Sequence, residues 1–121
     1  MTEAELREKI VEVGRRLHAR FFVAANDGNI SARLDEKDFL ITPTTVNKGD
    51  LTVEQLLKVD AEGRVLSGAL RPTSEMKMHL AVYRRRPDVR AIVHAHPPAA
   101  TAFAACRLRL DQDVILPEVV F

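Results

Sequence analysis

The chain has 121 residues, of which 46% are hydrophobic and 29% are charged, and its formal net charge is +1. This length suits one domain and is too short for two of ordinary size. The balanced charge gives no electrostatic reason to expect a nucleic acid or a membrane as a partner. Because there is one cysteine, no signal peptide and no apolar run near 18 residues, we expect a cytoplasmic protein.

The N-terminal segment predicts an amphipathic helix. Thr2 and Glu5 have the spacing of a capping box at its start. Apolar residues then recur at three- and four-residue steps as far as Phe21, which gives the helix one apolar face.

A turn and two strands are predicted next. Residues 26–29 read Asn-Asp-Gly-Asn, in which Gly28 and Asn29 can both take positive φ. Backbone N–H groups in such a turn can bind an anion, although a plain helix-to-strand turn explains the same residues. Strands are expected at 30–34 and 39–42.

A hydroxyl-rich loop, residues 41–50, leads to a short helix that begins with a second capping box. Thr52 and Gln55 have the required spacing. Residues 57–60 and 65–67 then predict a β-hairpin.

A second long helix is predicted from Glu75 to about Arg86, with Thr73 or Ser74 as its cap. Glu75 falls in the first turn, where the helix dipole favours an ionised carboxylate, and this residue taken alone favours an ordinary helix-start acid. His79 lies one turn further along the same face, either as a packed histidine or as a ligand or its support.

The strongest chemical signal is the pair His94 and His96, at the end of an apolar, β-branched run that predicts a strand. On a strand, side chains at i and i+2 point to the same face, about 6.5–7 Å apart, so two imidazoles can share a metal ion. The pair alone is incomplete, because catalytic zinc usually takes three protein ligands. The alternative is two polar residues at a strand end.

The C-terminal part of the chain predicts a helix and then a strand. Residues 99–105 are rich in alanine, which would let this helix pack closely against the sheet. Residues 114–121 are rich in β-branched and aromatic residues, unlike the polar termini of most proteins. We therefore expect a truncated chain that stops inside a strand.

Four motifs in this order resemble the class II aldolase/adducin family, which includes L-fuculose-phosphate aldolase and L-ribulose-5-phosphate 4-epimerase. The motifs are residues 27–33, 41–43, 72–75 and 93–97. The resemblance covers essentially all of residues 1–121, as the N-terminal portion of a single domain. It implies an α/β fold, a three-layer α/β/α sandwich with a mainly antiparallel central sheet that is incomplete at the C-terminus.

The resemblance also implies a set of site residues. A zinc ion, or another divalent transition metal, would be held by His94, His96 and a further histidine, which none of the four histidines of this chain matches. Glu75 matches the acid/base residue of the family. The substrate phosphate would be bound by three pairs of residues: Gly28 with Asn29, Thr44 with Thr45, and Thr73 with Ser74. Asp27 stands where the family commonly has serine, and Thr45 where it commonly has glycine.

The implied function is that of a zinc-dependent aldolase-type lyase acting on a small ketose or ketose phosphate. The metal would stabilise an enediolate while Glu75 moves a proton at the adjacent carbon. Family members commonly form homotetramers, so a homo-oligomer is expected. The same chemistry serves epimerisation, dehydration and decarboxylation.

Two functions of a different kind are also compatible with parts of the sequence. One is a non-catalytic adducin-like interaction module, which needs none of Glu75, His94 and His96. The second is an unrelated zinc hydrolase, which leaves the three anion-type loops unexplained.

Overall fold

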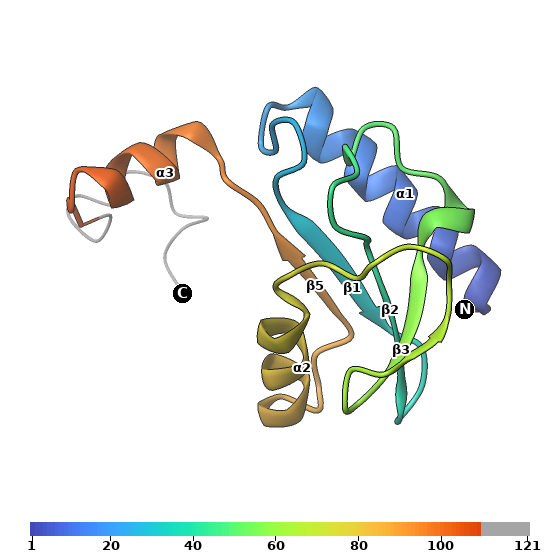
Figure 1. The fold of residues 1–121 in the computed structure, drawn as a ribbon. Coiled ribbons are helices and arrows are strands. Elements are labelled where there is room, and N and C mark those ends of the chain that lie inside the picture. The colour runs from blue at the N-terminus through green and yellow to red at the C-terminus, as the bar shows by residue number, and fades with distance from the viewer. Residues whose placement is uncertain (110–121) are drawn as a thin grey trace.

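The computed structural model describes residues 1–109, and these form a sheet with helices around it (Figure 1). The sheet has five antiparallel strands in the order β4-β3-β2-β1-β5, which confirms the predicted antiparallel architecture. The strands are β1 (Asn29–Arg33), β2 (Asp38–Ile41), β3 (Leu57–Asp60), β4 (Val65–Ser67) and β5 (Ala91–His94). The strand predicted at 114–121 lies outside the described residues.

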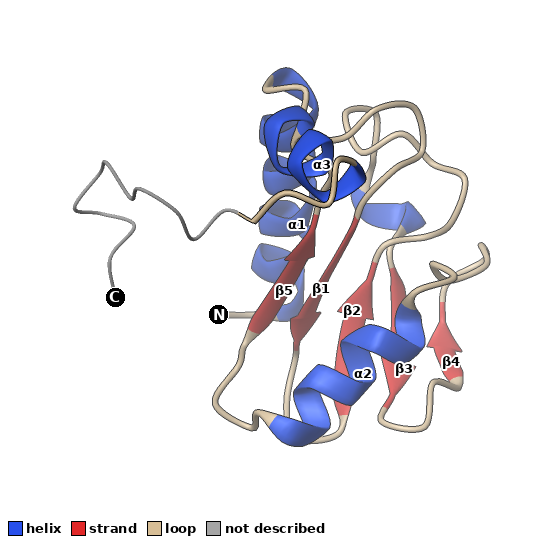
Figure 2. Cartoon of the chain, turned by 90° about the vertical axis from the view of Figure 1, so that its left-hand side faces the viewer, coloured by secondary structure: helices blue, strands red, loops and turns tan. Residues whose placement is uncertain are grey.

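The sheet lies between two helices, α1 (Glu3–Ala19) and α2 (Met76–Arg85) (Figure 2). Successive residues of β2 divide between the two faces: Leu40 packs in the cluster under α1, whereas Phe39 and Ile41 pack in the cluster under α2. This alternation follows from the two-residue period of a strand. Strand β2 is therefore buried on both sides, and the predicted layers are confirmed.

The first helix begins as predicted but ends earlier. Thr2 N donates to Glu5 Oε2 at 2.7 Å, and Glu5 N donates to Thr2 Oγ1 at 3.2 Å, which completes the capping box. The helix ends at Ala19, and Phe21 beyond it has φ 58° and is 80% exposed. The prediction that the apolar face extends to Phe21 is wrong, because the backbone leaves the helix before that residue.

The two short elements between the long helices follow their local signals. The 3-10 helix η1 (Val53–Gln55) begins where Thr52 N donates to Gln55 Oε1 at 3.0 Å. The β3–β4 hairpin is closed by the Asp60 carboxylate, which accepts the backbone N–H groups of Glu62 and Arg64. Both predictions are confirmed.

The third helix, α3 (Pro98–Ala105), stands away from the sheet in Figure 1, and all of its residues are exposed. The prediction that it packs against the sheet is wrong for the described residues. Alanine side chains bury little apolar area, so composition alone does not bring such a helix onto a surface. Within residues 1–109, no helix is long and apolar enough to cross a membrane.

Candidate functional site

Three loops meet at the end of the sheet where β1 begins. The first precedes β1, the second follows β2 and the third leads into α2. Pro43 of the second loop forms an isolated β-bridge with Pro72 of the third. The backbone N–H of Thr73 also donates to the carbonyl of Thr42 at 3.1 Å. The second and third loops are thus fixed to each other by backbone contacts.

Lys48 joins the first loop to the second. Its side chain is 1% exposed, and Nζ donates to the backbone carbonyls of Asn26, at 3.3 Å, and of Val46. Burial lowers the pKa of Lys48 below its usual range. Lys48 could not be predicted from the sequence, because lysine is seldom buried and no motif marks this residue.

The three loops enclose a cavity of about 180 Å³. Five of the six residues predicted to bind substrate line it; the sixth, Thr45, does not. Thr45 has φ 59°, in the left-handed region that favours glycine, and its hydroxyl donates to the carbonyl of Thr44 at 2.7 Å. The lining residues are Asn26, Asp27, Gly28, Asn29, Pro43, Thr44, Thr73, Ser74, Glu75 and His96.

Gly28 lets the first loop lie directly against β5. Its φ is 71°, and an added Cβ would stand 2.5 Å from Val23 Cγ1 and 2.8 Å from the carbonyl oxygen of His94. Both the conformation and the space therefore require glycine at this position.

Glu75 is the N-cap residue of α2, so the helix begins one residue later than predicted, and the prediction that Thr73 or Ser74 is its cap is wrong. Its backbone N–H donates to Thr73 Oγ1 at 3.3 Å, and its carboxylate makes no capping hydrogen bond with the helix. Oε2 accepts a hydrogen bond from Asn29 Nδ2 and lies 2.6 Å from His94 Nδ1. The Asn29 bond is the main reason that the pKa of Glu75 falls below its usual range; partial burial opposes the shift and the His94 bond adds to it. The carboxylate is therefore ionised at neutral pH.

The two predicted metal ligands lie side by side, although only one of them is on the strand. Strand β5 ends at His94, and His96 follows in the next segment, where its backbone N–H donates to the carbonyl of Phe22 at 2.8 Å. The ring centroids are 4.9 Å apart in an edge-to-face arrangement. Their Nδ1 atoms face carboxylates: Glu75 at 2.6 Å for His94, and Asp27 at 3.8 Å for His96.

The two histidine rings are arranged as two of the ligands of a divalent metal ion would be. An ionised carboxylate can only accept, so the proton of neutral His94 lies on Nδ1 and Nε2 keeps its lone pair. The position of Asp27 favours the same tautomer in His96. Over residues 1–109, no three His, Cys, Asp or Glu side chains gather as a metal-binding group. The described residues therefore supply part of a coordination shell.

Buried polar side chains continue from Glu75 into the layer between α2 and the sheet. His79 is fully buried, with Nε2 2.5 Å from Asn29 Oδ1 and Nδ1 2.6 Å from Ser31 Oγ. Ser31 Oγ in turn lies 2.8 Å from the hydroxyl of Tyr83. Burial lowers the pKa of His79 to about 4, so this histidine is neutral at pH 7. It is a packed histidine, as one of the two interpretations of the sequence predicts, and it also contacts a site residue.

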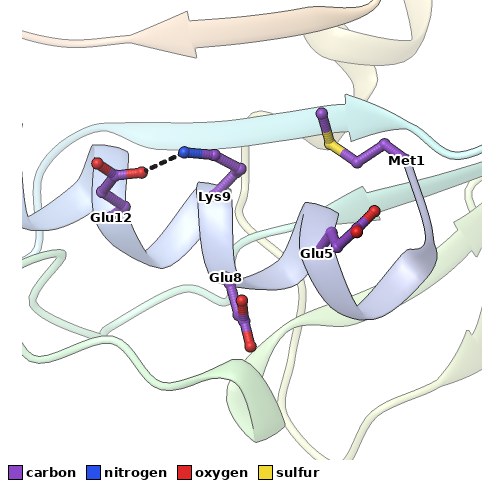
Figure 3. A pocket seen from close by; sticks show the side chains of 5 residues that line it. All are labelled: Met1, Glu5, Glu8, Lys9 and Glu12. Carbon is purple, nitrogen blue, oxygen red and sulfur yellow. Dashed lines mark hydrogen bonds and ion pairs between the residues drawn. The ribbon is translucent and has the colours of Figure 1, made fainter.

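A second hollow, of about 560 Å³, lies along the exposed side of α1 (Figure 3). It is lined by Met1, Glu5, Glu8, Lys9 and Glu12, and the ammonium of Lys9 lies 2.9 Å from the carboxylate of Glu12. Four of the five are charged residues of α1, and none of the predicted site residues lies there. The smaller cavity is the candidate site.

Comparison with known proteins connects this site to a family. A family model described as the class II aldolase and adducin N-terminal domain matches residues 8–119. A 3-oxo-tetronate 4-phosphate decarboxylase of Haemophilus influenzae is 40% identical, over 93% of this chain and 53% of its own length. A methylthioribulose-1-phosphate dehydratase of Methylococcus capsulatus is 42% identical, over 83% of this chain and 49% of its own length.

A solved structure gives the same result for the fold. An L-fuculose-1-phosphate aldolase of Thermus thermophilus superposes with a TM-score of 0.73 at 40% identity, covering 86% of this chain and 52% of that protein. The chain thus spans about half the length of the relatives it matches.

The position of Gly28 generates a stability prediction. We expect Gly28→Ala to lower the free energy of unfolding by about 2–4 kcal/mol, because left-handed strain adds to the clash with the His94 carbonyl. Gly63→Ala is the matched control: its φ is also positive, at 85°, but the new Cβ would meet the flexible end of Met76. The control should lose only about 1–2 kcal/mol in urea denaturation. Equal losses in the two variants would contradict the clash.

The burial of His79 predicts how stability depends on pH. Its pKa is about 4 in the folded chain, against an ordinary value of 6.5 for a solvated histidine. Between these values the unfolded chain binds the extra proton, so the free energy of unfolding should rise with pH, by up to about 1.4 kcal/mol per pH unit from this group. Urea denaturation at several pH values measures the slope. His79→Gln removes the titrating group, and an unchanged slope in that variant would disprove the assignment.

Proposed function

Because this chain belongs to the class II aldolase and adducin family, we propose that it carries the proton-transfer and substrate-binding part of a metal-dependent aldolase-type lyase for a small ketose phosphate. The observation that carries the proposal is the contact between Glu75 and His94, 2.6 Å apart, beside a cavity formed by the three predicted loops. An interaction module would have no use for this combination. A zinc hydrolase would have no use for the loops.

His94 and His96 are proposed as metal ligands through their Nε2 atoms. Zinc, or another divalent transition metal, bound there would polarise the substrate carbonyl and stabilise negative charge on the neighbouring atoms. The contribution of the chain is to hold both rings: Glu75 and Asp27 face the Nδ1 atoms, and the backbone bond to Phe22 fixes the segment that carries His96. The third ligand stays a prediction.

Glu75 is proposed to move the proton. In the direction of C–C bond formation, its carboxylate removes a proton from the carbon next to the substrate carbonyl. In the direction of cleavage, it takes up the proton that the substrate hydroxyl releases as the C–C bond breaks and gives it to the carbon of the enediolate. Two features support this role. The hydrogen bond from Asn29 keeps Glu75 ionised, as a base must be at rest, and 40% of the side chain is exposed, which leaves room for a reacting group.

The loops are proposed to bind the phosphate of the substrate. The hydroxyl groups of Thr44, Thr73 and Ser74 and the turn at Gly28 come from different loops and line one cavity. The cavity volume of about 180 Å³ is smaller than that of pockets for drug-sized ligands, which favours a small substrate. Asp27 lines the same cavity and opposes a second negative charge by Coulomb repulsion, so its carboxylate should weaken the affinity for phosphate.

The proposal also specifies which reaction accompanies the proton transfer. The relatives above are named as a decarboxylase, a dehydratase and an aldolase. All of these reactions develop negative charge on a carbon next to a carbonyl, so the same residues would serve each of them. We place aldol cleavage first, and product analysis distinguishes it by a free aldehyde rather than CO₂ or a dehydrated sugar. A homotetramer and a cytoplasmic location stay predictions.

The metal proposal predicts a loss of zinc on removal of either ligand. The purified chain should bind zinc. His94→Ala and His96→Ala should each lose most of it, because the one remaining histidine binds zinc more weakly than the pair does. Zinc content measured after equilibrium dialysis checks this. His18→Ala, on α1, is the matched control and should keep the zinc. Equal zinc content in all four proteins would contradict the site.

The proton-transfer proposal predicts a large loss of rate without loss of metal. In the zinc-loaded protein, Glu75→Gln should slow the uptake of deuterium from heavy water into dihydroxyacetone phosphate by about 10²–10⁴-fold, the usual contribution of a positioned acid or base. Its zinc content should stay the same. Glu62→Gln, an exposed hairpin residue, is the control. If Glu75→Gln exchanges deuterium as fast as the parent protein, Glu75 is only an acid at a helix start.

A further inference from the structure

A line of hydrogen-bonded side chains connects the buried layer under α2 to the carboxylate of Glu75. Glu75, His79 and Tyr83 follow one another at four-residue steps along one side of α2 and its N-cap, and Asn29 and Ser31 are alternate residues of β1. The two rows face each other, and the contacts cross between them from Tyr83 to Ser31, to His79, to Asn29 and to Glu75. Helix and strand are joined here by polar contacts.

We propose that His79 is a positioning residue, which holds the side-chain amide of Asn29 in the one orientation that donates to Glu75. The proposal rests on the proposed role of Glu75 as the proton-transfer residue. His79 touches neither the cavity nor the carboxylate itself, and it acts through Asn29.

The direction of every hydrogen bond in the line follows from the carboxylate of Glu75 at its end. An ionised carboxylate can only accept, so Nδ2 of Asn29 must face Glu75, and Oδ1 of the same amide must face His79. The Nε2 atom of His79, 2.5 Å from Oδ1, must then carry the proton. In a neutral ring Nδ1 is left as an acceptor, and the hydroxyl of Ser31 donates to it at 2.6 Å.

Burial makes this orientation exclusive. Asn29 is 4% exposed and His79 fully buried, so water cannot stand in for a missing partner. If the amide of Asn29 turned over, its oxygen would face the carboxylate and its NH₂ group would face the Nε2–H of His79, and both contacts would be repulsive. Throughout the described part of the chain, no buried side-chain nitrogen or oxygen lacks a hydrogen-bond partner. The line is fully satisfied in one arrangement only.

Packing alone does not explain a histidine at this position. The neighbouring buried residue of α2, Leu80, fills its place in the core with an apolar side chain. A histidine at full burial needs a partner for each ring nitrogen, and an unpaired one would cost free energy. The polar residue therefore does something that leucine does not, which is to present an N–H group to Asn29. In agreement, the bond from Asn29 is the largest influence on the pKa of Glu75.

The first test needs no substitution. In the metal-free chain at pH 7, the ¹⁵N chemical shifts of the His79 ring should show the proton on Nε2 and none on Nδ1. A proton on Nδ1, or on both nitrogens, would overturn the proposal, because Nε2 could then not be the sole donor that orients Asn29.

The second test compares two amide substitutions, each of which places a polar group near only one of the two ring nitrogens of His79. Glutamine places its NH₂ group near the position of Nε2 and can still donate to Asn29, whereas asparagine reaches only the position of Nδ1 and can contact only Ser31. The Asn29 side-chain NH₂ protons should exchange with water about fivefold faster in His79→Asn than in His79→Gln, which is the effect of one lost hydrogen bond. In the zinc-loaded protein, kcat for deuterium uptake into dihydroxyacetone phosphate should be lower in His79→Asn than in His79→Gln by a similar factor. The KM of the two variants should be the same.

The outcomes separate this proposal from the proposed function. Equal exchange of the Asn29 protons in both variants would show that His79 acts by packing alone and would overturn the proposal. The exchange and tautomer measurements use the metal-free chain without substrate, so they stand even if Glu75→Gln leaves deuterium uptake unchanged. If His79→Asn does not fold, the tautomer in the unsubstituted chain still decides.

Discussion

The hydrogen bond between Asn29 and Glu75 is the contact on which the geometry of the site depends. Asn29 is the first residue of β1, and in the antiparallel register it stands opposite His94 of β5. Its side chain bonds to Glu75 and His79, and it lies 3.4 Å from His94 Nδ1. One amide thus connects the proposed proton-transfer residue at the start of α2 to a proposed metal ligand on β5. A register shift of one residue would turn this side chain to the face under α1 and separate the two.

Much of this arrangement could be predicted from the sequence, because its signals are local. The capping boxes, the hairpin and the strands follow from the spacing of neighbouring residues. Glu75, His94 and the loop residues were expected at one site because their motifs occur in the family order, and five of the six predicted loop residues line one cavity. The registers that bring these residues together depend on which strands pair, and no single motif predicts the pairing.

The features that could not be predicted depend on partners that are distant in sequence. Lys48 looks like a solvated loop residue until the carbonyls of Asn26 and Val46 are seen around its ammonium group. His79 carries no motif, and its role follows only from two residues of β1 on the facing strand. Phe21 and α3 are errors of the opposite kind: an apolar or alanine-rich pattern indicates that burial is possible, but it does not supply the surface that would bury it.

The exposure of the site residues increases from the buried layer under α2 toward the cavity. Exposure rises from zero at His79 to 29% for the His94 side chain and 40% for that of Glu75. This gradient assigns the protonation states: His79 is neutral because its charged form cannot be solvated, whereas Glu75 is ionised because Asn29 donates to it and solvent still reaches it. The surroundings lower both pKa values, so at neutral pH Glu75 is a charged carboxylate and His79 is a neutral ring. The environment thus suits Glu75 to its proposed role as the base, and the buried contacts of His79 with Asn29 support it.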